Sequence, residues 1–338
     1  MVWATPLARR FRTDDRPMFG ARIKRGIMAW GGLAALALLG ACEMFEPVEP
    51  VLTPKVRPAG LAPPQVPDIQ ATSQESAALR SYLAQVQSSQ LTSGLLRQDG
   101  GGPDTPFTSD MLARNFEEIV FFNEYAAPGV RPGSASALRR WTAPVRIGIE
   151  FGPSVPPSQR TRDTNDVIAY ARRLAQATGH PISVSDNPNF LVFFVSEDDR
   201  AATLNARAPG LPGVNRTNLA PVRNLPGDAY CAVAAYASGP ERSTYTAAVA
   251  VIRAENPDLL RLSCIHEELA QGLGLANDSP DARPSIFNDD DEFALLTGHD
   301  VKLLGMLYDK RLRPGIGLAE AKPIVRTLAA EATSTGPS

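Results

Sequence analysis

Two adjacent carboxylates, Glu267 and Glu268, are the side chains of this chain with the clearest potential for chemistry. Crowding or partial burial can raise the pKa of one carboxyl group enough for general acid–base catalysis that needs no metal. The alternative is structural, because neighbouring side chains on a helix diverge by about 100° and can be solvated or paired with arginine. The residues alone leave both interpretations open.

The segment around these glutamates is expected to be a helix. Asn256 is a suitable N-cap and Pro257 a suitable first helical residue, and the helix should run to about Gly272. At about 100° per residue, one face carries Leu262, Ile265, His266, Leu269 and Leu273, and the opposite face carries Cys264, Glu267, Glu268 and Gln271. The carboxylates and the amide therefore share a side. His266 is predicted to pack among the leucines with a backbone partner.

The stretch from Cys264 to Asp278 is similar to the active-site helix of zincin and metzincin metallopeptidases, whose motif is HExxHxxGxxH. In that motif three histidines bind zinc, a glutamate activates water, and a glycine turns the chain toward the third ligand. Aligned by its glutamate and glycine, the resemblance implies Glu267, Gln271 and Asn277 as metal ligands, Glu268 as catalytic base and Gly274 at the turn.

The implied ligand set changes the expected metal. Carboxylate and amide oxygens suit a hard cation such as calcium better than zinc, and neutral amides bind any ion less strongly than imidazoles do. Zinc is therefore not favoured, calcium is compatible with the set, and the cofactor stays unidentified. Starting the motif at His266 puts Ala270 at the second ligand position, so that register fails.

The resemblance to metzincins continues beyond this helix. The segment 285–287 stands where those peptidases have a methionine-bearing turn beneath the metal, and the segment 296–309 resembles their closing helix. The strand order that we expect before the helix is also similar. The resemblance implies that a substrate would lie extended along the sheet edge above the helix.

A closer resemblance, from about Ser76 to Arg326, is to a family of proteobacterial lipoproteins, domain of unknown function 2927. It rests on four stretches: Gly94–Arg97, Asp104–Phe107, Ser263–Pro280 and Tyr308–Gly315. That family brings no assigned activity, so the peptidase-like fold is an expectation from the more distant likeness.

The pattern of apolar residues predicts an α+β fold preceded by a helical N-terminal cover. The resemblance to metzincins implies that its mixed sheet is zincin-like. Helices are expected over 73–90, from Ser109, over 164–178 and over 257–272. Strands are expected over 145–151, 181–184, 190–195, 231–237 and 245–253, with an irregular segment over 202–227.

The N-terminal segment resembles a bacterial lipoprotein signal. An apolar run from Ile27 to Leu39 follows basic residues and ends at Leu39-Gly40-Ala41-Cys42. The run is shorter than the roughly 20 residues that span a membrane. The resemblance implies cleavage before Cys42, lipidation of Cys42 with palmitate, and a periplasm-facing protein anchored in the cell envelope. Glu43 favours the outer membrane over the inner one.

Five regions are predicted: a lipoprotein signal peptide (1–41), a proline-rich periplasmic spacer (42–70), a helical N-terminal region (71–140), a zincin-like α+β domain (141–316), and a C-terminal helix with a disordered tail (317–338).

The 34 basic and 36 acidic residues offer no basic face for nucleic acid.

Two cysteines, Cys231 and Cys264, remain once Cys42 is lipidated. Disulfides form and persist in exported proteins, so we predict that these two pair. The alternative is two separately buried thiols.

Taken together, these features predict an envelope lipoprotein with a degenerate metallopeptidase-like domain. It would bind a peptide, protein or cell-wall partner without catalysis, and its lipid anchor would hold it to a membrane. The alternative is an atypical hydrolase in which Glu268 is the general base, with a non-zinc metal or a carboxylate pair.

Overall fold

The computed structural model describes residues 72–122, 134–238, 242–288 and 290–334. These ranges belong to one compact unit of the chain. The expected signal peptide, Cys42 and the spacer up to residue 70 lie outside the described residues. In the described ranges, no helix is both long enough and apolar enough to cross a membrane.

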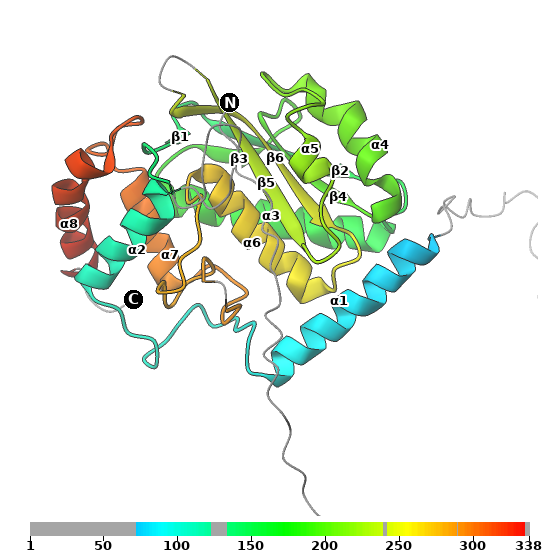
Figure 1. Ribbon diagram of the computed structural model, residues 1–338, viewed down its shortest axis with the longest axis horizontal. Coiled ribbons are helices and arrows are strands. Elements are labelled where there is room, and N and C mark those ends of the chain that lie inside the picture. Colours follow the sequence, from blue (N-terminus) through cyan, green and yellow to red (C-terminus); the bar gives the residue numbers. More distant parts are fainter. Residues whose placement is uncertain (1–71, 123–133, 239–241, 289, 335–338) are drawn as a thin grey trace, which may run out of the picture. The chain divides into compact units, whose positions relative to one another are not determined.

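A six-stranded, mostly parallel sheet forms the centre of the fold (Figure 1). Its strands are β1 (Arg140–Trp141), β2 (Val145–Phe151), β3 (Ile182–Val184), β4 (Phe190–Val195), β5 (Cys231–Ser238) and β6 (Thr244–Arg253). The order is β1-β6-β4-β2-β3, and β5 pairs with β6. The pairing of β5 with β6 is antiparallel and the other pairings are parallel. The expected α+β class with a mixed sheet is confirmed.

Strand β4 shows why the sheet lies between two layers. All six of its residues are buried. Phe190, Val192 and Phe194 pack in a large core on one face of the sheet, and Leu191, Phe193 and Val195 pack in a smaller core on the other. A parallel strand that is apolar at every position needs cover on both faces, since successive side chains point to opposite sides.

Helices supply that cover. Helices α3 (Pro157–Thr178), α6 (Asp258–Leu273) and α7 (Gly298–Leu307) pack on the side of the larger core. Helices α4 (Glu197–Arg207) and α5 (Ala220–Arg223) pack on the side of the smaller core. Figure 1 shows α6 running along the sheet next to β5. Helix α6 therefore lies where the side chains singled out by the sequence can meet the last strand of the sheet.

Three further helices surround this arrangement: α1 (Gln74–Thr92), α2 (Ser109–Phe121) and α8 (Leu318–Ser334). Helix α2 packs against α8 and α7. Helix α1 is attached through a hydrogen bond of 2.6 Å from Ser76 Oγ to Glu255 Oε1, and through Gln87 Oε1, which accepts from the backbone N–H of Leu260 at 3.1 Å. The expected N-terminal and C-terminal helices are therefore present.

Several expected boundaries were wrong. The segment 202–227 is not irregular throughout, since it holds most of α4, a short 3-10 helix (Ala208–Gly210) and α5. Helix α3 begins at Pro157 rather than at residue 164, because proline suits the first helical position. Helix α2 begins at Ser109 as expected, but its N-cap is Thr108 rather than Ser109, and the N-cap of α6 is Pro257 rather than Asn256. Asn256 instead donates from Nδ2 to the carbonyl oxygen of Tyr230 at 3.0 Å.

Candidate functional site

Helix α6 lies very close to the sheet at the end that carries Gly272. A Cβ atom on this glycine would meet the ring of Phe190 at 2.5 Å, so no larger side chain fits without a shift. The carbonyl oxygen of Gly272 accepts a hydrogen bond of 2.8 Å from Trp141 Nε1. The glycine and the tryptophan together fix the distance between the helix and strands β4 and β1.

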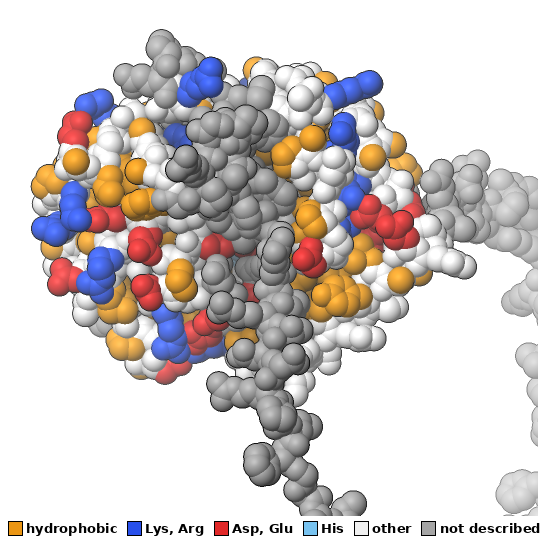
Figure 2. Space-filling model, in the orientation of Figure 1, with side chains coloured by type: hydrophobic (Ala, Val, Ile, Leu, Met, Phe, Trp, Pro, Cys, Tyr) orange, Lys and Arg blue, Asp and Glu red, His pale blue; other side chains and the backbone are white. Residues whose placement is uncertain are grey.

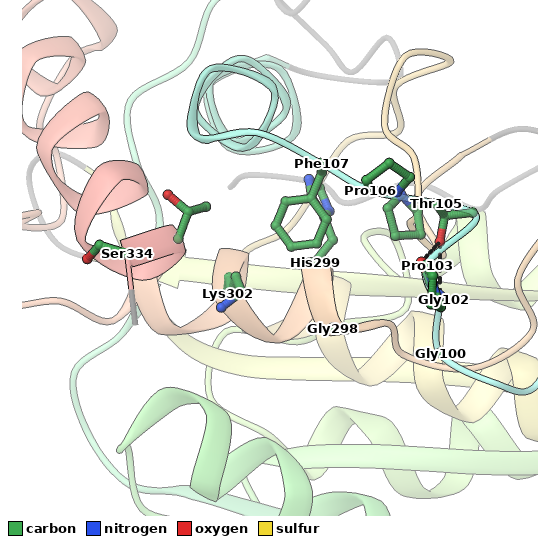
Figure 3. A pocket seen from close by; sticks show the side chains of 13 residues that line it. Gly100, Gly102, Pro103, Thr105, Pro106, Phe107, Gly298, His299, Lys302 and Ser334 are labelled. Atoms are coloured by element: carbon green, nitrogen blue, oxygen red, sulfur yellow. Dashed lines mark hydrogen bonds between the residues drawn. The ribbon is translucent and has the colours of Figure 1, made fainter. Parts of the chain in front are cut away.

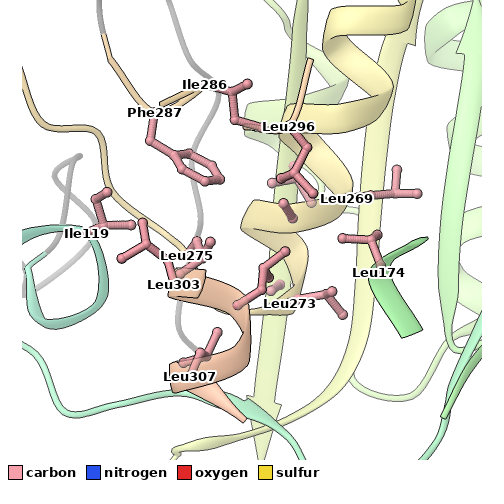
Figure 4. Close-up of a cluster of buried hydrophobic side chains, with 14 of the residues drawn as sticks. Ile119, Leu174, Leu269, Leu273, Leu275, Ile286, Phe287, Leu296, Leu303 and Leu307 are labelled. Atoms are coloured by element: carbon pink, nitrogen blue, oxygen red, sulfur yellow. The ribbon is translucent and has the colours of Figure 1, made fainter. Parts of the chain in front are cut away.

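The leucine face of α6 packs as expected. Leu269 and Leu273 lie in a cluster with Leu303 and Leu307 of α7 and with Phe287 of the preceding loop (Figure 4). All of these side chains are essentially inaccessible to solvent. Phe287 occupies the turn that was compared with the methionine-bearing turn of metzincins, and it contributes apolar packing there.

The opposite face of α6 carries the two carboxylates, and it is buried as well. Glu267 is 3% exposed, Glu268 0% and Gln271 3%. A carboxylate oxygen of Glu267, a carboxylate oxygen of Glu268 and Cys231 Sγ all lie within 4.8 Å of one another. The alternative in which these glutamates are simply solvated is therefore wrong, because the fold removes both from water at the start of β5.

A disulfide between Cys231 and Cys264 joins β5 to α6, with Cα atoms 5.9 Å apart. The predicted pairing is confirmed. Asn256 lies beside it, with Nδ2 at 3.7 Å from Cys264 Sγ. Because Cys264 precedes Glu267 and Glu268 by three and four residues on α6, the disulfide and the carboxylates share one face of the helix.

Gln271 continues this face by one more turn. Its Nε2 is buried and has no hydrogen-bond partner among the residues that the structure describes. An amide that is 3% exposed normally finds partners, because an unsatisfied buried polar group costs about 1–3 kcal/mol. Gln271 is thus a buried amide whose Nε2 lacks the hydrogen-bond acceptor that such a group normally has.

Asn277, the third implied ligand, is directed to another element. Its Nδ2 donates to the carbonyl oxygen of Glu118 on α2 at 3.0 Å. Gly274 makes the intervening turn at a φ of 128°, and a Cβ there would lie 2.4 Å from the carbonyl oxygen of Arg139. The structure therefore brings Glu267 and Glu268 together with Cys231, while it holds Asn277 against α2.

His266 is a packed histidine with a backbone partner, as predicted. Its Nδ1 accepts a hydrogen bond of 2.9 Å from the backbone N–H of Leu296, and its ring stacks on Tyr170 at a centroid distance of 4.0 Å. Burial, together with the nearby charge of Arg173, lowers the pKa of His266 to about 3. The imidazole is therefore neutral and structural.

The buried His266 makes stability depend on pH. Its pKa is about 3 when folded and about 6.5 when unfolded, so the unfolded chain binds the extra proton below pH 6.5 and stability falls as the pH is lowered toward 3. We expect a loss of about 2–3 kcal/mol from this residue between pH 7 and pH 4.5. Urea denaturation of the wild type and of His266→Gln at both pH values measures the difference. Equal pH dependence in the two proteins would contradict this assignment.

A pocket of about 550 Å³ lies away from the carboxylates, and its residues come from segments far apart in the sequence (Figure 3). It is lined by the loop 100–107, by His299 and Lys302 of α7, and by residues near the end of α8. His299 is 0% exposed, because Phe107 packs edge-on against its ring and Asn115 Nδ2 lies 3.1 Å from Nε2. Lys302 Nζ donates to the carbonyl oxygen of Ala332 at 2.8 Å.

The pocket was missed because its residues are not adjacent in sequence. In the sequence, the stretch Asp104–Phe107 carries a family resemblance but no pattern that predicts a pocket. On the face seen in Figure 2, acidic and basic side chains are interspersed, in agreement with the near-neutral composition.

The fold and the site define an α+β protein with a mostly parallel sheet and a buried carboxylate pair beside a disulfide. The family model described as protein of unknown function (DUF2927) matches residues 109–327. This match covers more than half of the chain, so the chain belongs to that family. No curated protein and no solved structure matches it.

Proposed function

We propose that this protein is a lipid-anchored envelope protein whose zincin-like domain binds an extended peptide segment of a protein or cell-wall partner without cleaving it. The observation that carries the proposal is the position of β5. In the described part of the chain it pairs with β6 alone, runs antiparallel to it, and lies against α6. The order β3-β2-β4-β6-β5 ahead of α6 also supports the likeness to zincins.

The backbone of β5 defines where a partner strand would bind. The carbonyl oxygen of Tyr230 accepts from the N–H of Arg253 at 3.2 Å, so alternate residues from Tyr230 onward face β6. Cys231, Val233 and Ala235 therefore direct their N–H and C=O groups away from β6. Such groups are the template for adding a strand to a sheet edge.

The chemistry of the implied metal ligands supports binding without catalysis. The set contains one carboxylate, Glu267, and two neutral amides, Gln271 and Asn277, which is a weak donor set for zinc. The amide of Asn277 is hydrogen-bonded to α2, and Cys231, beside the carboxylates, is disulfide-bonded. These residues fit a zinc centre of the peptidase type poorly, so the proposed binding involves no metal at this set of residues.

Proline at Ala235 should weaken binding. The substitution removes one outward N–H that a partner strand would use, and loss of about one hydrogen bond corresponds to roughly a tenfold higher Kd. Isothermal titration of the full chain against a panel of extended peptides and cell-wall fragments measures the effect. Ala235→Ser, which keeps the N–H, is the matched control. Equal Kd values for the two variants, or no binding of any panel member by the wild type, would argue against the proposal.

The alternative is a hydrolase in which Glu268 is the general base. The convergence of two buried carboxylates within 4.8 Å favours it, because such pairs can share a proton. If the wild type hydrolyses any member of the same panel, Glu268→Gln should lower the rate about 10²- to 10⁴-fold. An unchanged rate in that variant would remove Glu268 from the mechanism, and an inactive wild type would leave the binding role.

The envelope location rests on the lipobox ending at Cys42. We propose that Cys42 carries the lipid and that Glu43 directs the protein to the outer membrane. Labelling cells with a palmitate analogue should mark the wild type and leave Cys42→Ser unlabelled. Label on the variant would place the lipid elsewhere.

A further inference from the structure

The disulfide lies beside the two carboxylates: Cys231 Sγ and one oxygen each of Glu267 and Glu268 lie within 4.8 Å of one another, and Cys264 Sγ is bonded to Cys231 Sγ. Cys264, Glu267 and Glu268 lie on one face of α6, and Cys231 lies at the start of β5. All four side chains are at most 3% exposed. One turn further along the same face, Nε2 of the buried Gln271 has no hydrogen-bond partner in the described ranges.

We propose that reduction of this disulfide creates a binding site for a single thiophilic divalent cation, of which zinc is the type, held by the sulfurs of Cys231 and Cys264 and by the carboxylates of Glu267 and Glu268. Two thiolates and two carboxylates are four ligands of the kinds that zinc accepts in tetrahedral sites. While the disulfide is closed, its sulfurs are not thiolates and the site is not available.

This proposal differs from the ligand set implied by the peptidase resemblance, because it uses neither Asn277 nor the amide of Gln271. It is also independent of the proposed binding of a partner along β5. Cation binding is measured directly on the protein, so failure of one proposal leaves the other untouched.

The chemical step has two parts. A dithiol reductant gives two electrons and two protons to the disulfide, so that the S–S bond breaks, two cysteine thiols form and the reductant becomes a disulfide. The cation then binds the two sulfurs, and each thiol releases its proton to solvent. The two carboxylates bind in their charged form and balance the charge of the cation.

The required movement is small. Sulfur atoms bound to one tetrahedral zinc at about 2.3 Å each lie roughly 3.8 Å apart. Sulfurs joined in a disulfide lie about 2.05 Å apart, so they must separate by about 2 Å, which rotation about the cysteine side-chain bonds supplies. The backbones are already close, with Cα atoms 5.9 Å apart.

Cobalt binding to the full chain in detergent tests the proposal. The protein is reduced with a phosphine, the reductant is removed under anaerobic conditions, and the protein is titrated with Co²⁺. We expect one Co²⁺ per chain, with the near-ultraviolet charge-transfer band of cobalt–thiolate bonds, and displacement of the cobalt by Zn²⁺. The oxidised protein should lack the band. Cys42→Ser should retain it after reduction, because that cysteine is not a ligand.

The carboxylates are tested by a double variant, Glu267→Gln with Glu268→Gln, which should bind Co²⁺ at least tenfold more weakly after reduction. Glu150→Gln, at a carboxylate paired with Arg207 in another part of the sheet, is the matched control and should bind like the wild type. Absence of the band in the reduced wild type, or unchanged affinity in the double variant, would overturn the proposal. Circular dichroism after reduction checks the fold, and an unfolded reduced chain would overturn it too.

Discussion

Replacing Arg261 by methionine should lower the free energy of unfolding by about 3–5 kcal/mol, because it leaves the carboxylate of Asp163 buried without its cation. Arg261 Nε lies 2.6 Å from Asp163 Oδ1, and the two side chains are 4% and 1% exposed. The pair joins α6 to α3. Arg261 also donates from Nη1 to the carbonyl oxygen of Asn256 at 2.7 Å, so its loss also loosens the start of α6.

Urea denaturation at pH 7 measures this effect. Arg311→Met is the matched control, because Arg311 is 39% exposed and pairs with Asp309 and Glu331 at the surface. Exposed ion pairs contribute about 1 kcal/mol or less. Combining Arg261→Met with Asp163→Leu should recover much of the loss, since both charges are then absent. A single Arg261→Met variant within about 1 kcal/mol of wild type would mean that solvent reaches Asp163.

Opening the disulfide should lower the free energy of unfolding by about 3–4 kcal/mol. The bond closes a loop with a sequence separation of 33 residues, and the chain-entropy model gives a cost of that size for a loop of about this length. For a domain of this size, the melting temperature should fall by roughly 10 °C. Scanning calorimetry of the wild type, with and without reductant, and of Cys231→Ser with Cys264→Ser measures the shift.

The double serine variant distinguishes the effect of losing the disulfide from any other effect of the reductant on stability. It should melt at the temperature of the reduced wild type, and added reductant should not change it further. Zn²⁺ should raise the melting temperature of the reduced wild type and not that of the serine variant, because a ligand that binds the folded state stabilises it. A serine variant that melts with the oxidised wild type would mean that the loop is already constrained by β5 pairing.

The parts of the fold that could be predicted from the sequence are those with strong local patterns. Strand β4 was predicted with its exact ends, because six apolar residues between Asn189 and Ser196 leave little choice. The disulfide followed from counting cysteines, on the expectation that the chain is exported. The face of α6 that holds Glu267, Glu268 and Gln271 followed from helical geometry alone.

The rest depended on contacts between distant segments. Burial of Glu267 and Glu268 arises because Cys231, more than thirty residues earlier, places β5 against α6. Burial of His299 arises because Phe107 and Asn115 cover it. Helix α4 begins with three acidic residues, which favour a helix N-terminus, but its polar sequence shows little apolar periodicity. Local periodicity carries no information about such contacts.

The cross-link between β5 and α6 has a kinetic consequence. An edge strand that is hydrogen-bonded on one side only normally frays. Binding of a partner strand must then order it, at a cost in conformational entropy. Here the first residue of that strand is pinned to a helix that Gly272 and Trp141 seat firmly on the sheet. In the binding proposed above, the end of β5 that holds Cys231 would already be fixed when a partner strand arrives, so differences in affinity between partners should appear as differences in residence time.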